Sequence, residues 1–180
     1  ATVSWGTTRD LAFELARKTV KLDGKTDSWE GVEPIYEPSE VSQNAFLRQQ
    51  AYGIKGIYIC RDEKFLFWRV DFNESNPFVK RPNGIGKGLT LQISPWMEMA
   101  RRSFDMAVTY NRDGNRMDSY LGSWNDATKK WSKIADSVIM TKLSKDMLVA
   151  KLDIKWVSKH ITEMGNLQLT LANLDNSYQW

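Results

Sequence analysis

The chain has 180 residues with 42% hydrophobic and 12% aromatic content, which is typical of one packed globular domain and excludes a disordered segment. Its 25 basic and 22 acidic residues give a net charge of +3 without a concentrated basic face, so we expect no nucleic-acid partner. The single cysteine excludes an internal disulfide and a multi-cysteine zinc site, and no apolar run approaches the ~18 residues of a membrane span.

The N-terminal residues 8–18 carry apolar side chains at two competing spacings. Leu11 and Leu15 fit one face of a helix, whereas Leu11, Phe13 and Leu15 alternate as in a strand. A threonine and an aspartate at the start of this run can serve as helix caps, so we predict a short N-terminal helix. The domain organisation that follows is an extension over residues 1–18 and a main domain over residues 19–180.

The next stretch, residues 20–34, reads VKLDGKTDSWEGVEP. Its first three residues predict a short apolar strand, and Asp23-Gly24 predicts a tight turn. Glycine takes positive φ freely, and aspartate accepts a hydrogen bond from the backbone two residues on. Trp29 follows the turn and is expected to fold back into the core.

The rest of the chain alternates between short strand-like runs and turns. Residues 73–88 are expected to form a loop, because prolines and glycines interrupt them, and residues 156–163 to contain one or two helical turns. Strands are predicted over residues 52–60, 65–72, 89–94, 106–111, 116–124, 131–135, 138–143, 147–154 and 167–174. This pattern predicts an all-β fold, namely a two-sheet antiparallel β-sandwich of immunoglobulin-like or jelly-roll type with the short N-terminal helix.

The strand over residues 65–72 has two different faces, because successive strand residues point to opposite sides. The uniformly apolar set is expected to face the core: Leu66, Trp68, Val70 and Phe72. The other set mixes aromatic and charged residues: Phe65, Phe67, Arg69 and Asp71. Cys60, in the preceding apolar run, is expected to be buried and inert.

Three stretches of the chain resemble the family 9 carbohydrate-binding module and related DOMON-type sandwich domains. LDG-KT-DSW resembles the family's opening, a strand reading IDG followed by DW. GIYICRDEKFLFWRVDF is similar to its second signature, with Asp62, Leu66 and Phe67 at matching positions, and LQLTLANLDN resembles its closing strand. The late E-x-x-I-P run is replaced by VAKLD, which lacks the glutamate and the proline.

The resemblance covers most of residues 19–175. It implies a non-catalytic β-sandwich in an extracellular or periplasmic location. The implied partner is a carbohydrate or glycan surface, together with other domains of a longer chain.

Mixed aromatic and polar strand faces suit saccharides. Pyranose rings expose an apolar face that packs on flat aromatic rings, and their hydroxyls need directed polar partners. One candidate ligand-binding set is Phe67, Arg69 and Asp71, and a second is Trp124 and Trp131, on the two sides of a short turn. Tryptophans beside turns also cover sheet ends, so the second set has a purely structural reading as well.

Two cofactors follow from the resemblance. A structural calcium ion would use Asp23 and Asp27, although the turn alone accounts for Asp23. Haem, which some DOMON relatives bind between methionine and histidine or lysine, would use His160 and one of seven methionines. The methionines also serve as gap fillers in a core, and we do not favour haem.

No spacing of residues indicates catalysis. The single histidine, His160, has no nucleophile placed beside it by the sequence, and no spacing selects a pair among the 22 acidic residues. We therefore expect a non-catalytic carbohydrate-binding module and not an enzyme. The alternatives are a protein-docking β-sandwich scaffold of a larger extracytoplasmic protein and, less favoured, a haem-binding DOMON-type domain.

Overall fold

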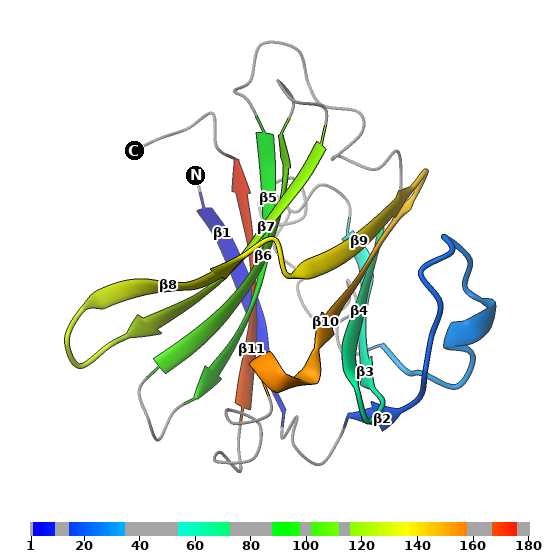
Figure 1. Ribbon diagram of the computed structural model, residues 1–180, viewed down its shortest axis with the longest axis horizontal. Coiled ribbons are helices and arrows are strands. Elements are labelled where there is room, and N and C mark those ends of the chain that lie inside the picture. The colour runs from blue at the N-terminus through cyan, green and yellow to red at the C-terminus, as the bar shows by residue number, and fades with distance from the viewer. Residues whose placement is uncertain are drawn as a thin grey trace. The chain divides into compact units, whose positions relative to one another are not determined.

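The computed structural model describes residues 2–9, 15–34, 54–72, 88–97, 102–111, 116–157 and 167–175. These residues form two β-sheets and two short 3-10 helices (Figure 1). The chain divides into two compact units. The first unit comprises residues 1–14, 84–139 and 155–180, and the second comprises residues 15–83 and 140–154.

The first unit holds a six-stranded antiparallel sheet with the strand order β1-β11-β5-β6-β7-β8. Its strands are β1 (Thr2–Arg9), β5 (Gly88–Met97), β6 (Arg102–Asn111), β7 (Arg116–Asn125), β8 (Lys130–Asp136) and β11 (Leu167–Asp175). Figure 1 shows the first and last strands of the chain, β1 in blue and β11 in red, side by side. β1 therefore forms one edge of the sheet, next to β11, and β8 forms the opposite edge.

The second unit holds a five-stranded sheet with the order β2-β3-β4-β10-β9. Its elements are β2 (Ala16–Arg17), η1 (Asp27–Trp29), β3 (Ile54–Arg61), β4 (Phe65–Phe72), β9 (Ile139–Ser144) and β10 (Met147–Asp153). After β10, η3 (Ile154–Trp156) spans the point where the chain returns to the first unit. The strands β3, β4 and β10 pair antiparallel, whereas the two-residue β2 runs parallel to β3.

The all-β character and the predicted strands between residues 52 and 174 are confirmed, with boundary shifts of a few residues. The strand β5 runs past the predicted end at Ser94 to Met97. Its pairing with β6 skips Ser94 and Pro95 and resumes at Trp96, as expected for a proline that has no N–H to donate. The predicted loop over residues 73–88 lies outside the described part except for Gly88, which begins β5. Of the predicted helical turns over residues 156–163, residues 158–163 also lie outside it.

The predicted N-terminal helix is wrong at both of its described ends. Residues 2–9 form β1, which pairs with β11 along its whole length, and residues 16–17 form β2. Residues 10–14 lie outside the described part. Local helix preference is worth tenths of a kcal/mol per residue, roughly, and a full ladder of interstrand hydrogen bonds overrides it.

The predicted strand over residues 20–22 is also wrong, because these residues have no strand partner. Val20 is instead buried in an apolar cluster. Val20 and the partly buried Leu22 pack against the face of a sheet and do not extend its edge.

At least one face of each sheet buries apolar side chains. In the five-stranded sheet the predicted core set of β4 is confirmed, with Trp68 only 1% exposed. In the six-stranded sheet the corresponding side chains are Phe104, Met106, Val108 and Leu121. The opposite faces of the two sheets differ, and they hold the two candidate ligand-binding sets.

Candidate functional site

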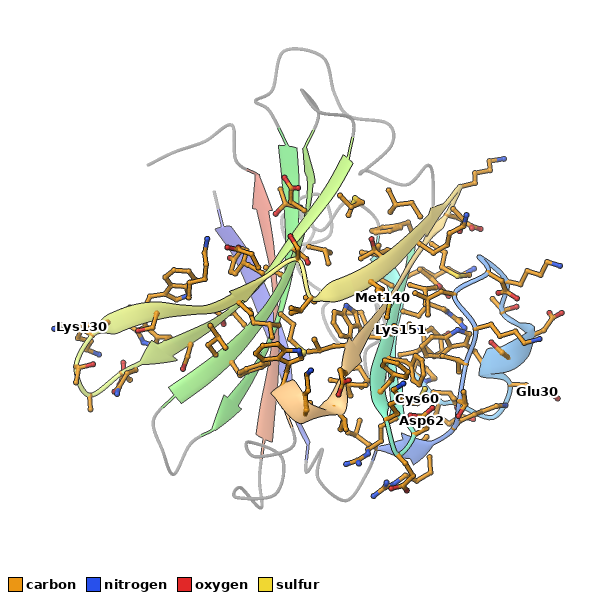
Figure 2. All side chains as sticks on the ribbon, viewed as in Figure 1. Glu30, Cys60, Asp62, Lys130, Met140 and Lys151 are labelled. Carbon is orange, nitrogen blue, oxygen red and sulfur yellow. The ribbon has the colours of Figure 1, made fainter. Side chains whose placement is uncertain are left out.

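Residues 15–34, hereafter the covering segment, lie along one face of the five-stranded sheet (Figures 1 and 2). The bend at Asp23-Gly24 is confirmed: Gly24 has φ +73°, and Asp23 Oδ1 accepts the Lys25 N–H at 3.0 Å. η1 then brings Trp29 onto the sheet, where it is 3% exposed, as predicted for a core residue. The apolar cluster beneath the segment consists of Val20, Trp29, Val32, Cys60, Phe67, Met147 and Val149.

Asp62 joins the covering segment to the β3–β4 turn. Its Oδ2 accepts the Thr19 hydroxyl at 2.7 Å, and its Oδ1 accepts the N–H groups of Lys64 and Phe65 at 2.8 and 2.7 Å. Partial burial opposes ionisation, but these hydrogen bonds outweigh it and lower the pKa of Asp62. Figure 2 labels Asp62 beside Cys60, at the end of β3.

The first candidate set, Phe67, Arg69 and Asp71, lies under the covering segment. Phe67 is 2% exposed and Arg69 is 5% exposed. Arg69 donates through Nε and Nη2 to the two carboxylate oxygens of Asp71, both at 2.8 Å, and its Cζ lies 3.9 Å from the Tyr58 ring centroid. The structure thus brings the three residues together, but a saccharide could reach Phe67 and Arg69 only by displacing the covering segment.

The candidate calcium ligands are Asp23 and Asp27. Calcium takes six to eight oxygen ligands, roughly, and one Asp23 oxygen already accepts a backbone hydrogen bond. Within the described ranges, no three His, Cys, Asp or Glu side chains gather as a metal site would require. Calcium stays a prediction from the resemblance, as does haem, because His160 lies outside the described part.

The second candidate set, Trp124 and Trp131, lies in the β7–β8 hairpin. The two residues are direct register partners, so they share one face of the six-stranded sheet. Trp131 is 44% exposed and Trp124 is half-buried. Figure 2 labels Lys130 at the tip of this hairpin, next to Trp131 in the chain.

Trp131 is held by three neighbours. Gly122 leaves room for the indole, because a Cβ at that position would lie 2.6 Å from Trp131 Cζ2. The Trp131 Nε1–H donates to Asp105 Oδ2 at 3.2 Å, and the Tyr120 ring meets the indole edge-on with centroids 5.8 Å apart. The indole is therefore fixed in position while much of it remains exposed.

Three polar side chains lie around Trp131. Asp105 is 6% exposed. Burial, and then the charge of Asp105, raise the pKa of Tyr120, so its phenol stays protonated through neutral pH and can donate a hydrogen bond. Lys133, on the neighbouring part of β8, pairs with Asp136 at 3.2 Å. The cluster offers an aromatic surface with hydrogen-bonding groups at its margin.

The sequence did not single out Asp105, Tyr120 or Gly122. Asp105 fell one residue before the predicted strand. Gly122 carried the clearest signal, since a glycine within a strand pattern often marks close approach of another group. The register partner of Gly122 is Lys133, so its contact with the Trp131 side chain runs diagonally across the β7–β8 pair, and the sequence pattern contains no sign of this contact.

Comparison with protein-family models, curated proteins and solved structures finds no match to this chain. None of the helices in the described ranges is long and apolar enough to cross a membrane. The interpretation of the site therefore depends on its own geometry.

Proposed function

We propose that this chain is a non-catalytic carbohydrate-binding module and that its saccharide contacts the β7–β8 hairpin. The observation that carries the proposal is the position of Trp131, an exposed indole that is held by contact with Gly122 and by the hydrogen bond from its Nε1–H to Asp105. A ring already held in place loses little conformational freedom when a ligand packs against it.

The chemistry of this face suits a sugar. The exposed part of the indole can pack on the C–H face of a pyranose, and Trp124 lies next to it in the register. The neutral Tyr120 phenol supplies a hydrogen-bond donor close to the same ring. The face over Phe67 and Arg69 has no part in the proposal, because the covering segment occupies it.

We also propose that the two sheets form a β-sandwich of immunoglobulin-like or jelly-roll type. Each sheet has a face of buried apolar side chains, and sandwiches bury such faces together. An extracellular or periplasmic location and attachment to neighbouring domains come from the family resemblance alone.

The test is a calorimetric titration of the protein with soluble oligosaccharides of different linkage, at up to millimolar concentration. At least one sugar class should bind saturably, and Trp131→Ala should weaken that binding on the order of tenfold or more, as expected for a tryptophan at the centre of a contact. Trp156→Ala is the matched control, because Trp156 is partly buried in η3 and has no place in the β7–β8 hairpin.

Two results would overturn the proposal. One is that no saccharide binds in the panel. The other is that Trp131→Ala and Trp156→Ala weaken binding equally, which would remove the site from the hairpin. A protein-docking scaffold would then be the better description of the chain.

A further inference from the structure

The register of the six-stranded sheet places Lys133 beside the Trp131 indole. Lys133, Gly122 and Asp105 are direct partners across β8, β7 and β6, and direct partners lie on the same face of a sheet. Trp131 shares this face, because it precedes Lys133 by two residues in β8. Its indole fills the space over Gly122, so it lies between the lysine on one side and the aspartate on the other.

The two charged side chains beside the indole differ in exposure. Asp105 is 6% exposed and accepts the Trp131 Nε1–H at 3.2 Å. The Lys133 side chain is 51% exposed, and its Nζ lies 3.2 Å from Oδ1 of Asp136, whose side chain is 62% exposed. A ligand that packs on the exposed part of the indole therefore meets the ammonium group of Lys133 and not the buried carboxylate.

The Lys133–Asp136 pair can exchange its carboxylate for an anionic group on a ligand. Exposed ion pairs contribute little to stability, because both groups are well hydrated and lose side-chain freedom when they pair. An anionic group on a sugar ring that packs against Trp131 would be held close to Lys133, at a high effective concentration. Asp136 can then return to water at little cost, since most of its side chain is already exposed.

The β7–β8 hairpin carries an excess of positive charge. Residues 125–136 contain three lysines and two aspartates, a net charge of +1: Lys129, Lys130, Lys133, Asp126 and Asp136. Lys129 pairs with Asp126 in the turn, whereas Lys130 is exposed at the tip (Figure 2). Lys130 directly precedes Trp131, so its side chain leaves the strand on the opposite face. It therefore adds attraction for an anion at longer range without contacting a ligand on the indole.

We propose that the saccharide is acidic and that the sugar ring on Trp131 carries a carboxylate or a sulfate, which Lys133 binds in place of Asp136. This inference rests on the proposed saccharide-binding function and specifies its substrate class. Uronic acids supply the carboxylate, and sulfated sugars supply the sulfate. The lysine ammonium suits either group, because it is a compact charge with three N–H donors on a flexible stem.

The test measures, by titration calorimetry, the affinity for acidic tetrasaccharides against that for their uncharged counterparts. Tetramers of galacturonate, mannuronate and glucuronate are compared with their methyl esters, and a carrageenan tetrasaccharide is compared with its desulfated form. At least one acidic chain should bind on the order of tenfold more tightly than its uncharged form, because that form cannot pair with Lys133. The difference should shrink as the salt concentration rises from about 20 mM to about 500 mM.

Three variants locate the contact. Lys133→Gln should lower the affinity for the acidic chain on the order of tenfold and leave that for the uncharged chain unchanged. Lys130→Gln is the matched control, because it removes the same charge from the opposite face, and it should lower the affinity by about twofold at most. Asp136→Asn should raise the affinity for the acidic chain by about threefold, since it frees Lys133. Circular dichroism checks that each variant is folded, and the comparison of charged with uncharged chains needs no variant.

The outcomes separate this inference from the proposed function. If no saccharide binds, acidic or neutral, both fail. If the uncharged chains bind as tightly as the acidic ones, saccharide binding stands and the acidic class is wrong. If folded Lys133→Gln and Lys130→Gln weaken binding equally, or if Asp136→Asn weakens it, the ion pair with Lys133 is wrong and the overall charge of the hairpin accounts for the attraction.

Discussion

The surroundings of Gly122 and Arg69 show most clearly how the two candidate ligand-binding sites differ. Gly122 makes room for an indole that stays exposed, whereas Arg69 is enclosed by the protein's own side chains. The difference cannot be read from residue type, because both positions lie on strand faces that mix aromatic and polar residues. It depends on what covers each face.

Gly122→Ala should displace the Trp131 indole without removing it. The new methyl group would lie 2.6 Å from Trp131 Cζ2, a distance that requires the ring to move. We expect saccharide affinity to fall on the order of tenfold, measured by titration calorimetry. In a Trp131→Ala background the same substitution should have no further effect on binding. An additive loss would contradict the proposal that Gly122 acts by making room for the Trp131 indole.

Arg69→Leu should destabilise the second unit. The substitution leaves the Asp71 carboxylate, whose side chain is 17% exposed, without its two hydrogen bonds from the guanidinium. We expect a loss of about 3 kcal/mol in the free energy of unfolding, measured in urea. The double variant Arg69→Leu/Asp71→Leu should recover part of that loss, and an equal or larger loss would mean that the pair is not the cause.

At the scale of elements, the covering segment is fixed to its sheet by apolar burial and by the Asp62 hydrogen bonds. Asp62 holds the β3–β4 turn through two backbone N–H groups and the segment through Thr19. One carboxylate therefore connects a hairpin turn to a segment more than forty positions earlier in the chain, since the bond to Thr19 spans 43 residues.

The pH dependence of stability should reveal this link. Because folding lowers the pKa of Asp62, its contribution is complete above the ordinary carboxylate pKa of about 4 and is lost as the pH falls through the lower pKa of the folded state. Asp62→Asn should thus reduce stability at neutral pH by about 1 kcal/mol and by less in acid, measured by urea unfolding across pH.

Glu63→Gln is the matched control for Asp62→Asn. Glu63 is the next residue in the turn, its side chain is 95% exposed, and its ion pair with Arg17 is at the surface at 3.5 Å. Such pairs contribute ~0–1 kcal/mol. Equal pH profiles for the two variants would contradict the role of Asp62.

At the scale of the whole molecule, the two units are interleaved along the chain. The backbone passes from one unit to the other four times, after residues 14, 83, 139 and 154. Neither unit is formed from one continuous piece of sequence. When one unit unfolds, the separate stretches of the other unit are therefore no longer held together at the points where the chain enters and leaves it.

The two units should accordingly unfold together. Cys60 reports on the second unit, because it is fully buried and burial, with a smaller contribution from Asp62, raises the pKa of its thiol to about 12. Pulsed labelling of this thiol in urea should give the same midpoint as hydrogen exchange of the β6 and β7 amides in the first unit. Separate midpoints, or rapid labelling in native buffer, would contradict cooperative unfolding.

The sequence by itself determined the strands from β3 to β11, the turn at Asp23-Gly24, and the burial of Trp29, Trp68 and Cys60. Alternation of apolar residues and local turn chemistry act over a few neighbouring positions, and both can be read from the order of residues. The same local reasoning failed for the N-terminal helix, where the partner strand β11 lies at the far end of the chain.

Only the tertiary structure decided which aromatic faces are covered. Phe67 and Trp131 both lie on mixed strand faces, yet the covering segment buries the first, whereas Gly122 and Asp105 hold the second with 44% of its surface exposed. The pairing of Trp124 with Trp131 likewise depends on the register between strands. The physical reason is that register and coverage are set by contacts between residues far apart in the chain, which local patterns do not encode.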